Sequence, residues 1–182
     1  MDINQILYTA RPADRRSGAE EAIYDKLDEL GISYARADHD PADTMELCLA
    51  IEKVLGAHIC KNLFLCNRQQ TQFYLLLMRG EKPFKTKYLS AQLGCSRLSF
   101  ADADHMAELL NTVPGSVSAL ELMFDTENRV QLVIDRPLLE DEFICAHPGR
   151  NRSTLRLERE ALLRFVRAVG HEPFFVELPV EE

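Results

Sequence analysis

The sequence predicts a single-domain α+β fold with a mixed, largely antiparallel β-sheet flanked by helices. Helical and strand patterns alternate irregularly, and at least two neighbouring pairs of strands have the pattern of antiparallel hairpins. The composition is globular, with 46% hydrophobic and 27% charged residues. No linker, repeat or low-complexity segment divides the chain, so we expect residues 1–182 to form one domain.

Capping residues predict where the helices begin, and glycines predict where several of them end. Ser17, Thr44 and Asp102 are the expected N-caps, and Ser17 has capping-box spacing to Glu20. The last helix carries its apolar residues on one face and is expected to end near Gly170. The other predicted helices cover residues 17–30, 44–55, 85–93 and 102–110, and the first three end at Gly31, Gly56 and Gly94.

Apolar runs bounded by polar turns predict the strands. NLFLC (62–66) and QFYLLLM (72–78), separated by NRQQT, predict a buried hairpin. ALELMF and VQLVID, separated by DTEN, predict a second one. The expected strands are 32–37, 62–66, 72–78, 97–101, 119–124, 130–135, 142–146 and 153–158.

Charge and cysteine usage limit the class of protein. A net charge of -8 argues against a broad phosphate-binding surface, although an enzyme that grips only the end of an RNA needs just a few local cations. Five cysteines without a CxxC pair argue against a disulfide framework. The sequence shows neither a signal peptide nor an apolar run long enough to span a bilayer, so we expect a cytoplasmic protein with no membrane partner.

Lys61 and Asn62 stand directly before a predicted buried strand. The stem of a lysine there can pack on apolar neighbours while its ammonium lies at the mouth of a cleft. Spacing alone favours the alternative, an ordinary, solvated lysine at a strand end.

The segment Val113-Pro114-Gly115-Ser116 has the pattern of a tight turn. Pro114 fixes φ, Gly115 can adopt positive φ, and the backbone N–H groups that follow can surround an oxyanion or a phosphate. A plain structural turn is the alternative. A serine hydrolase triad of Ser116, His147 and Asp135 is disfavoured because GxSxG is absent and a strand is expected next.

Two histidines precede prolines or threonines in loop-like segments. His147 at a strand end could bind a substrate group or order a water molecule, and His39 lies near Thr44, which the helix cap already explains. A structural role is the alternative for both histidines. His58 and Cys60 lack the paired spacing of zinc ligands, so we expect no metal and no cofactor.

Taken in order, these segments resemble the YbaK/prolyl-tRNA synthetase-associated (editing) domain family. The resemblance covers about residues 30–178. It depends on HxPxxT from His39, KNLFL from Lys61, LSFA from Leu98, PGSVS from Pro114 and the His147-Pro148 pair. The freestanding Ala-tRNA(Pro) deacylases are the most similar branch. Asn111, Ala119 to Leu122 and Gly149 depart from the family pattern, which puts amino-acid specificity in doubt more than fold or reaction.

The resemblance implies a barrel-like sheet and a trans-editing deacylase that hydrolyses the ester of mischarged Ala-tRNA(Pro). It implies Lys61, Gly115 and His147 as catalytic residues. It further implies that the substrate is bound by His39, Thr44, Asn62, Val113, Pro114 and Ser116. The expected partner is the aminoacylated 3′ end of tRNA, with prolyl-tRNA synthetase as a further candidate. A Cys-tRNA(Pro) deacylase and a noncatalytic module that binds a synthetase or tRNA are the alternatives.

Overall fold

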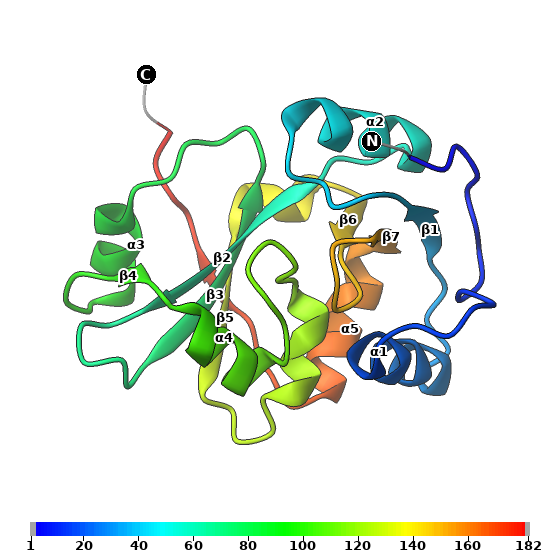
Figure 1. Ribbon diagram of the computed structural model, residues 1–182. Helices are drawn as coiled ribbons and strands as arrows, with labels where there is room; N and C mark the ends of the chain where they lie inside the picture. The colour runs from blue at the N-terminus through cyan, green and yellow to red at the C-terminus, as the bar shows by residue number, and fades with distance from the viewer. Residues whose placement is uncertain (1–2, 181–182) are drawn as a thin grey trace.

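Strands from distant parts of the sequence form two β-sheets in the computed structural model, which describes residues 3–180 (Figure 1). The larger sheet contains, in spatial order, β4 (Ser99–Phe100), β2 (Cys60–Cys66), β3 (Phe73–Arg79), β5 (Val130–Asp135) and β8 (Phe174–Val176). The smaller sheet contains β1 (Ala35–Asp38), β7 (Ser153–Glu158) and β6 (Phe143–Ala146). This arrangement confirms the predicted α+β class.

Both directions of strand pairing occur in the larger sheet. β2 pairs antiparallel with β3 and with β4, whereas β3 pairs parallel with β5 and β5 parallel with β8. All pairs in the smaller sheet are antiparallel. Within the described residues the two sheets remain separate, so the expected barrel-like closure is not formed.

The helices begin at the residues that the caps predict. Ser17, Thr44 and Asp102 each accept a hydrogen bond from a backbone N–H in the first turn of the helix that follows. Gly56 and Gly94 end their helices in the left-handed conformation. The α-helices are α1 (Gly18–Glu29), α2 (Met45–Leu55), α3 (Thr86–Leu93), α4 (Ala103–Leu110) and α5 (Arg159–Ala168).

The predicted strand 119–124 is wrong, because this segment forms the 3₁₀-helix η1 (Ala119–Phe124). Ser118 caps it, and Oε2 of Glu121 accepts the backbone N–H of Ser118 in a capping box. Four consecutive residues from Ala119 are buried, so the segment has no solvent-facing side that would produce strand alternation. The predicted hairpin with residues 130–135 is therefore absent, and β5 pairs with β3 instead.

Other differences are smaller. The strand expected over 32–37 begins at Ala35, and that expected over 97–101 shrinks to Ser99–Phe100. The sequence analysis did not predict β8 or the 3₁₀-helix η2 (Arg136–Glu140), since three residues give too short a pattern and Pro137 discourages a helix.

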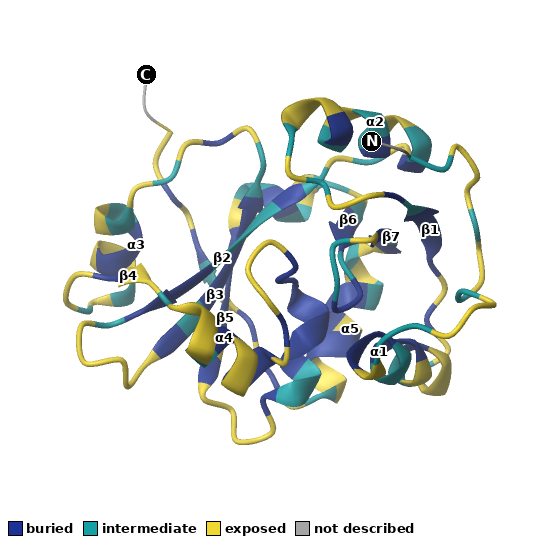
Figure 2. Ribbon diagram, viewed as in Figure 1, coloured by how far each residue is buried: buried dark blue, intermediate teal, exposed yellow. Residues whose placement is uncertain are grey.

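Apolar packing fills both faces of the larger sheet. One cluster joins α1, α4, α5 and η1 to strands of both sheets. A second cluster lies on the opposite face of the larger sheet and includes Leu65, Leu76 and Leu89 of α3. Figure 2 shows β2, β3 and β5 largely buried and the loops exposed. None of the helices in residues 3–180 has the length and apolar character needed to cross a membrane.

A buried ion pair fixes the C-terminal segment to the larger sheet. Lys82 Nζ donates to Asp135 Oδ2 at 2.7 Å and to the carbonyl of Leu178 at 2.6 Å. Asp135 Oδ1 accepts the amide of Leu178 at 2.8 Å. The side chains are 7% and 0% exposed, so each charge depends on the other for stabilisation.

Replacing Lys82 with methionine should therefore destabilise the fold. The buried Asp135 carboxylate would lose its counter-charge, which typically costs about 3–5 kcal/mol in the free energy of unfolding. Urea unfolding of Lys82→Met measures this loss. The double variant Lys82→Met/Asp135→Leu should recover about half of it, because the backbone groups of Leu178 still lack partners. A loss below about 1 kcal/mol in the single variant would contradict a buried, mutually dependent pair.

Candidate functional site

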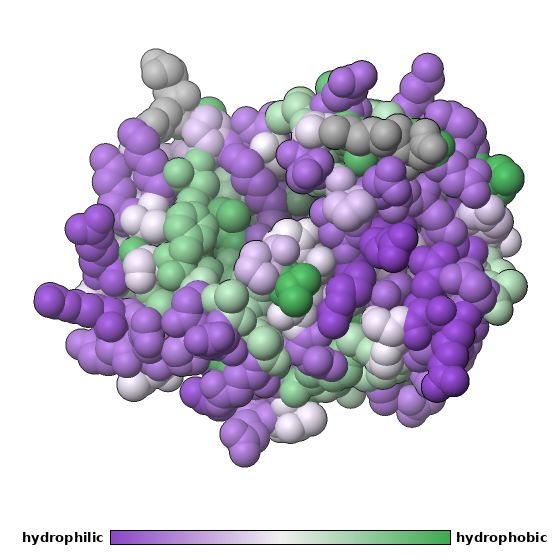
Figure 3. Space-filling view, in the orientation of Figure 1, coloured by the Kyte–Doolittle hydropathy of each residue, from purple (hydrophilic) through white to green (hydrophobic). Residues whose placement is uncertain are grey.

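A cavity of about 290 Å³ opens beside β2, the segment 111–118 and the end of β6. Its apolar wall consists of Leu63, Phe64, Phe100, Ala101, Met106 and Val117. Its remaining lining consists of Asn62, Pro114, Gly115 and His147. Figure 3 shows hydrophobic side chains gathered on this face between α3 and the loop 111–118. Four residues predicted for the site, from three separate segments, thus meet at one cavity.

The Pro-Gly turn lines this cavity and contains a backbone donor without a partner among the described residues. The amide of Ser116 donates to the carbonyl of Val113 at 3.0 Å, which closes the turn. Gly115 has φ of 87°, a conformation that side chains disfavour even though no atom would contact an added Cβ. Within residues 3–180, the Gly115 N–H makes no hydrogen bond. It can therefore donate to an oxyanion.

Hydrogen bonds hold the loop 111–118 against the loop between β6 and β7. Thr112 Oγ1 donates to the carbonyl of Gly149 at 3.0 Å, and the amide of Asn151 donates to Ser116 Oγ at 3.0 Å. Gly149 has φ of 88°, and a Cβ there would lie 3.4 Å from Ile23 Cδ1. The position of the turn relative to His147 is consequently defined on both sides.

Thr154 connects the two predicted histidines. His147 Nδ1 lies 3.1 Å from the carbonyl of Ser153 and 3.3 Å from Thr154 Oγ1. His39 Nε2 lies 2.8 Å from the same hydroxyl, and its Nδ1 lies 2.7 Å from the carbonyl of Asp40. Carbonyls only accept, so each Nδ1 carries a proton. Burial lowers the pKa of both histidines and so opposes a second proton on either ring. Both imidazoles are therefore neutral at neutral pH, and Thr154 donates to His39 Nε2.

The tautomer of His147 leaves Nε2 with a lone pair, and Nε2 makes no hydrogen bond to any described residue. Burial lowers the pKa of His147 to about 4, against the raising effect of the Ser153 carbonyl. Burial likewise lowers the pKa of His39. At neutral pH, His147 can thus accept a hydrogen bond from water or from a substrate amine.

A buried carboxyl supports the same region from behind. Ser118 Oγ lies 2.5 Å from Glu121 Oε2 and 2.6 Å from the carbonyl of His147, and Glu121 is fully buried. One hydroxyl proton cannot serve two acceptors. Burial raises the pKa of Glu121 well above its usual value, and a protonated Glu121 donates to Ser118, which then donates to His147. The sequence analysis assigned no role to Glu121, although its capping-box spacing to Ser118 was a usable signal.

Asn62 and Lys61 lie on opposite faces of β2, as consecutive strand residues do. Asn62 lines the cavity and donates through Nδ2 to the carbonyl of Cys60 at 3.3 Å and weakly to its thiol at 3.8 Å. The ammonium of Lys61 donates to the carbonyl of Lys82, and Lys61 is absent from the cavity lining. The structure therefore does not bring Lys61 together with His147.

The other predicted substrate-binding residues are absent from the lining of the cavity. Thr44 caps α2, Val113 is exposed, and Ser116 is buried with its hydroxyl on Asn151. His39 lines a neighbouring cleft. Their predicted roles in substrate binding stay predictions.

The departures from the family pattern lie behind the substrate loop. Asn111 ends α4 with φ of 51°, a left-handed conformation that asparagine tolerates better than most residues, which explains how it replaces glycine. Residues 119–122 are buried in η1 and do not line the cavity. The apolar lining, with Phe100 and Met106, was missed as a substrate wall.

Comparisons with known proteins agree with this geometry. The profile of the family described as "Aminoacyl-tRNA editing domain" matches residues 39–165. The prolyl-tRNA editing protein ProX of Acetoanaerobium sticklandii is 33% identical over 88% of this chain and 98% of its own length. The prolyl-tRNA synthetase associated domain-containing protein 1 of Danio rerio is 32% identical over 89% of this chain and 86% of its own length.

A solved structure has the same fold. It is described as a candidate trans-editing enzyme for prolyl-tRNA synthetase and superposes with a TM-score of 0.70 at 17% identity, covering 92% of this chain and all of that one. At this identity the match supports the fold alone. From the profile and the curated relatives we conclude that the chain belongs to the aminoacyl-tRNA editing domain family.

Proposed function

We propose that this protein is a trans-editing deacylase that hydrolyses the ester between alanine and the terminal ribose of tRNA(Pro). The observation that carries the proposal is the meeting of the unbonded Gly115 amide and the unbonded His147 Nε2 at one cavity. The name of the Acetoanaerobium sticklandii relative supports the choice of prolyl-tRNA editing. The tRNA is the partner in this proposal, with a prolyl-tRNA synthetase as a possible source of it.

Hydrolysis requires a donor for the developing oxyanion and a group that orients water. The Gly115 amide would donate to the carbonyl oxygen of the ester, and preorganised donors of this kind contribute much of the catalysis of acyl transfer. His147 Nε2 would accept a hydrogen bond from the water whose oxygen adds to the carbonyl carbon, and the proton that this water loses would pass to the leaving ribose oxygen. The bond between the carbonyl carbon and the ribose oxygen then breaks, and that oxygen regains a proton. The adjacent 2′-hydroxyl can carry this proton, so no covalent nucleophile is needed.

Two further residues have proposed roles in holding the substrate. Asn62 Oδ1 makes no hydrogen bond within the described chain and can accept from the α-amino group. Lys61, which the family resemblance implies as catalytic, would contribute its ammonium to the ester or to the terminal phosphate, and this requires it to leave the carbonyl of Lys82 and β2 to change its orientation toward the cavity.

Replacing Lys61 with alanine should nearly abolish deacylation. We expect kcat/KM to fall at least about 100-fold, because one well-placed charge-stabilising group contributes that much. The unfolding temperature should change little, since Lys61 is only half-buried. Lys53→Ala, which removes an exposed lysine of α2, is the control. Activity of Lys61→Ala within about twofold of wild type would remove Lys61 from the mechanism.

The pH profile tests His147. Because its pKa in the folded protein is about 4, wild-type kcat/KM should show no inflection near 6.5 and should fall only as the pH drops toward 4. His147→Gln should be slower and should lack this acidic limb. His58→Gln, at an imidazole that is 83% exposed, should keep the wild-type profile. A wild-type inflection near pH 6.5 that His147→Gln removes would show that His147 is not held neutral.

Stability must be measured alongside these rates. The pKa of His147 is depressed on folding, so the unfolded chain binds the proton first as the pH falls. The stability that the neutral imidazole contributes is thus complete above about pH 6.5 and is lost between there and about pH 4. Urea unfolding at each pH separates loss of catalysis from loss of fold.

Steric exclusion should decide the choice of amino acid. We expect hydrolysis of Ala-tRNA(Pro) and sparing of Pro-tRNA(Pro), since a tight wall excludes a ring more readily than it attracts a methyl group. Met106→Ala shortens one side chain of the apolar wall and so enlarges the cavity. It should raise the prolyl-to-alanyl ratio of kcat/KM at least about tenfold. Leu109→Ala, on the same helix and buried but outside the cavity, should leave this ratio unchanged.

Three substrates distinguish the alternatives. Comparable rates on alanyl and prolyl esters would defeat steric exclusion. Rapid hydrolysis of Cys-tRNA(Pro) alone would assign the chain to the cysteine-specific branch. Binding of tRNA without hydrolysis of any ester would indicate a noncatalytic module.

A further inference from the structure

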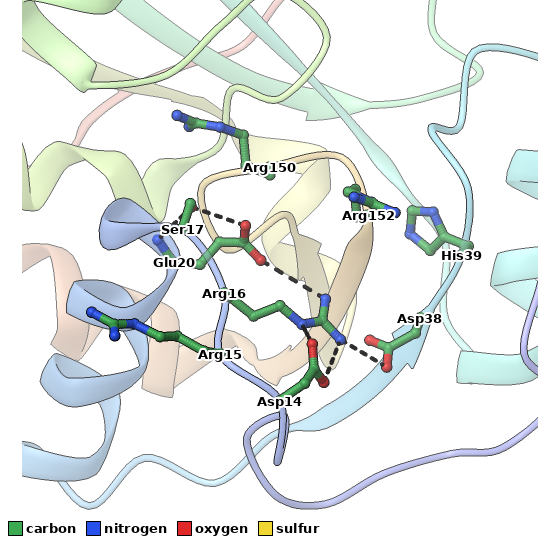
Figure 4. A pocket seen from close by; sticks show the side chains of 9 residues that line it. All are labelled: Asp14, Arg15, Arg16, Ser17, Glu20, Asp38, His39, Arg150 and Arg152. Carbon is green, nitrogen blue, oxygen red and sulfur yellow. Dashed lines mark hydrogen bonds and ion pairs between the residues drawn. The ribbon is translucent and has the colours of Figure 1, made fainter.

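A second, larger cleft of about 540 Å³ lies next to the cavity and contains four arginines (Figure 4). Arg15 and Arg16 come from the segment before α1, and Arg150 and Arg152 come from the loop between β6 and β7. We call this feature the arginine cleft. Figure 3 shows that strongly hydrophilic side chains dominate this part of the surface, around α1 and β1.

The carboxylates that line the arginine cleft already have hydrogen-bond or ion-pair partners within the protein. Arg16 binds Asp14 at 2.7 Å and Asp38 at 3.4 Å, and lies 3.9 Å from Glu20. Asp38 also accepts hydrogen bonds from Arg36 and from Ser153 Oγ. Burial alone would raise the pKa of Asp38, but these hydrogen bonds keep it below its usual value. The acidic groups therefore fix Arg16 in place, and Asp38 stays ionised at neutral pH.

Three guanidinium groups remain without a carboxylate partner among the described residues. Arg15 and Arg152 are exposed and make no side-chain hydrogen bond to them. Arg150 donates only to the carbonyls of Gly149 and Asn111, at 2.6 and 3.3 Å, so no carboxylate of the described chain lies within hydrogen-bond distance of it. A chain with a net charge of -8 thus gathers three unpaired cations at one cleft.

The arginine cleft adjoins the proposed reaction site. His39 lines the cleft, and the centre of its ring lies 6.1 Å from that of His147, which lines the cavity. Arg150 is bonded to Asn111, the first residue of the substrate loop. A ligand whose end occupies the cavity would therefore pass the cleft directly.

We propose that the arginine cleft binds phosphodiester groups of the RNA strand that leads to the ester. This inference rests on the proposed function, because the ester in the cavity determines where the strand must lie. Guanidinium groups bind phosphate oxygens through paired N–H donors, which makes arginine suited to this role. An acidic polypeptide offers similar charge but has no reason to end at the cavity.

The test uses Arg15→Ala/Arg152→Ala and a charge-matched control, Arg68→Ala/Arg97→Ala. Each pair removes two exposed arginines whose side chains make no hydrogen bond or ion pair with a described residue. The control pair lies in the β2–β3 turn and before β4. Two substrates are compared: Ala-tRNA(Pro) and alanyl-adenosine, which has the ester but no phosphodiester. Fluorescence anisotropy with a labelled RNA oligonucleotide ending in CCA gives the dissociation constant directly.

In the cleft variant, KM for Ala-tRNA(Pro) and Kd for the oligonucleotide should rise about tenfold, with kcat nearly unchanged. Alanyl-adenosine should react at the wild-type rate. The slope of log Kd against log salt concentration should become shallower by about 1.4, at roughly 0.7 per lost single-strand phosphate contact. The control pair should match wild type, and thermal unfolding of both variants should be unchanged.

Several outcomes would overturn the proposal. Unchanged KM and salt slope in the cleft variant would do so while leaving the deacylase proposal intact. Equal weakening by the control pair would show a response to net charge alone. Competition for the cleft by polyglutamate, with no binding of RNA, would assign it to an acidic polypeptide. If the wild type hydrolysed no ester yet its RNA binding required Arg15 and Arg152, the result would support RNA binding by the cleft and contradict the proposed reaction.

Discussion

The hydrogen-bonded connection from Glu121 through Ser118 to the carbonyl of His147 is the interaction on which the site depends. It joins the segment 113–124, which contains the Pro-Gly turn and η1, to the residue that follows β6, 29 positions from Ser118. Because Glu121 is fully buried, the connection excludes water and keeps a fixed geometry. A loop alone would not hold the Gly115 amide at a constant distance from an imidazole. A buried polar network attached to a sheet can do so.

The charges beside the proposed reaction site differ from the net charge of the whole chain. The chain is acidic overall, yet the cavity of the proposed reaction site contains a neutral histidine, and the neighbouring cleft contains arginines without a carboxylate partner among the described residues. Neutral groups suit ester hydrolysis, in which water must be oriented and an oxyanion stabilised. Cations placed only beside the reacting end give modest affinity, which allows a correcting enzyme to release its RNA after each turnover.

Local chemistry made much of the fold predictable. The caps at Ser17, Thr44 and Asp102 were confirmed because a side chain and a nearby amide settle them without the rest of the chain. The parallel pairing of β3 with β5 was not predictable, since it joins strands separated by more than fifty residues. The segment 119–124 was predicted wrongly because a fully buried helix has no polar face to show in its pattern. Within the site, the sequence indicates that Lys61 and Asn62, as consecutive strand residues, lie on opposite faces of one strand. It does not indicate which of the two faces the cavity lined by His147.

The anchoring of Asn62 on Cys60 has a consequence for redox chemistry. Burial raises the pKa of the Cys60 thiol to about 12, and burial also raises that of Cys145, whose carbonyl accepts a hydrogen bond from Cys60. The thiolate is the species that oxidants and electrophiles attack, so these two sulfurs are protected in the folded chain. Peroxide or an alkylating agent would first meet the partly exposed Cys48 and Cys95. Asn62, which lines the cavity, is thereby held against a sulfur that resists oxidation.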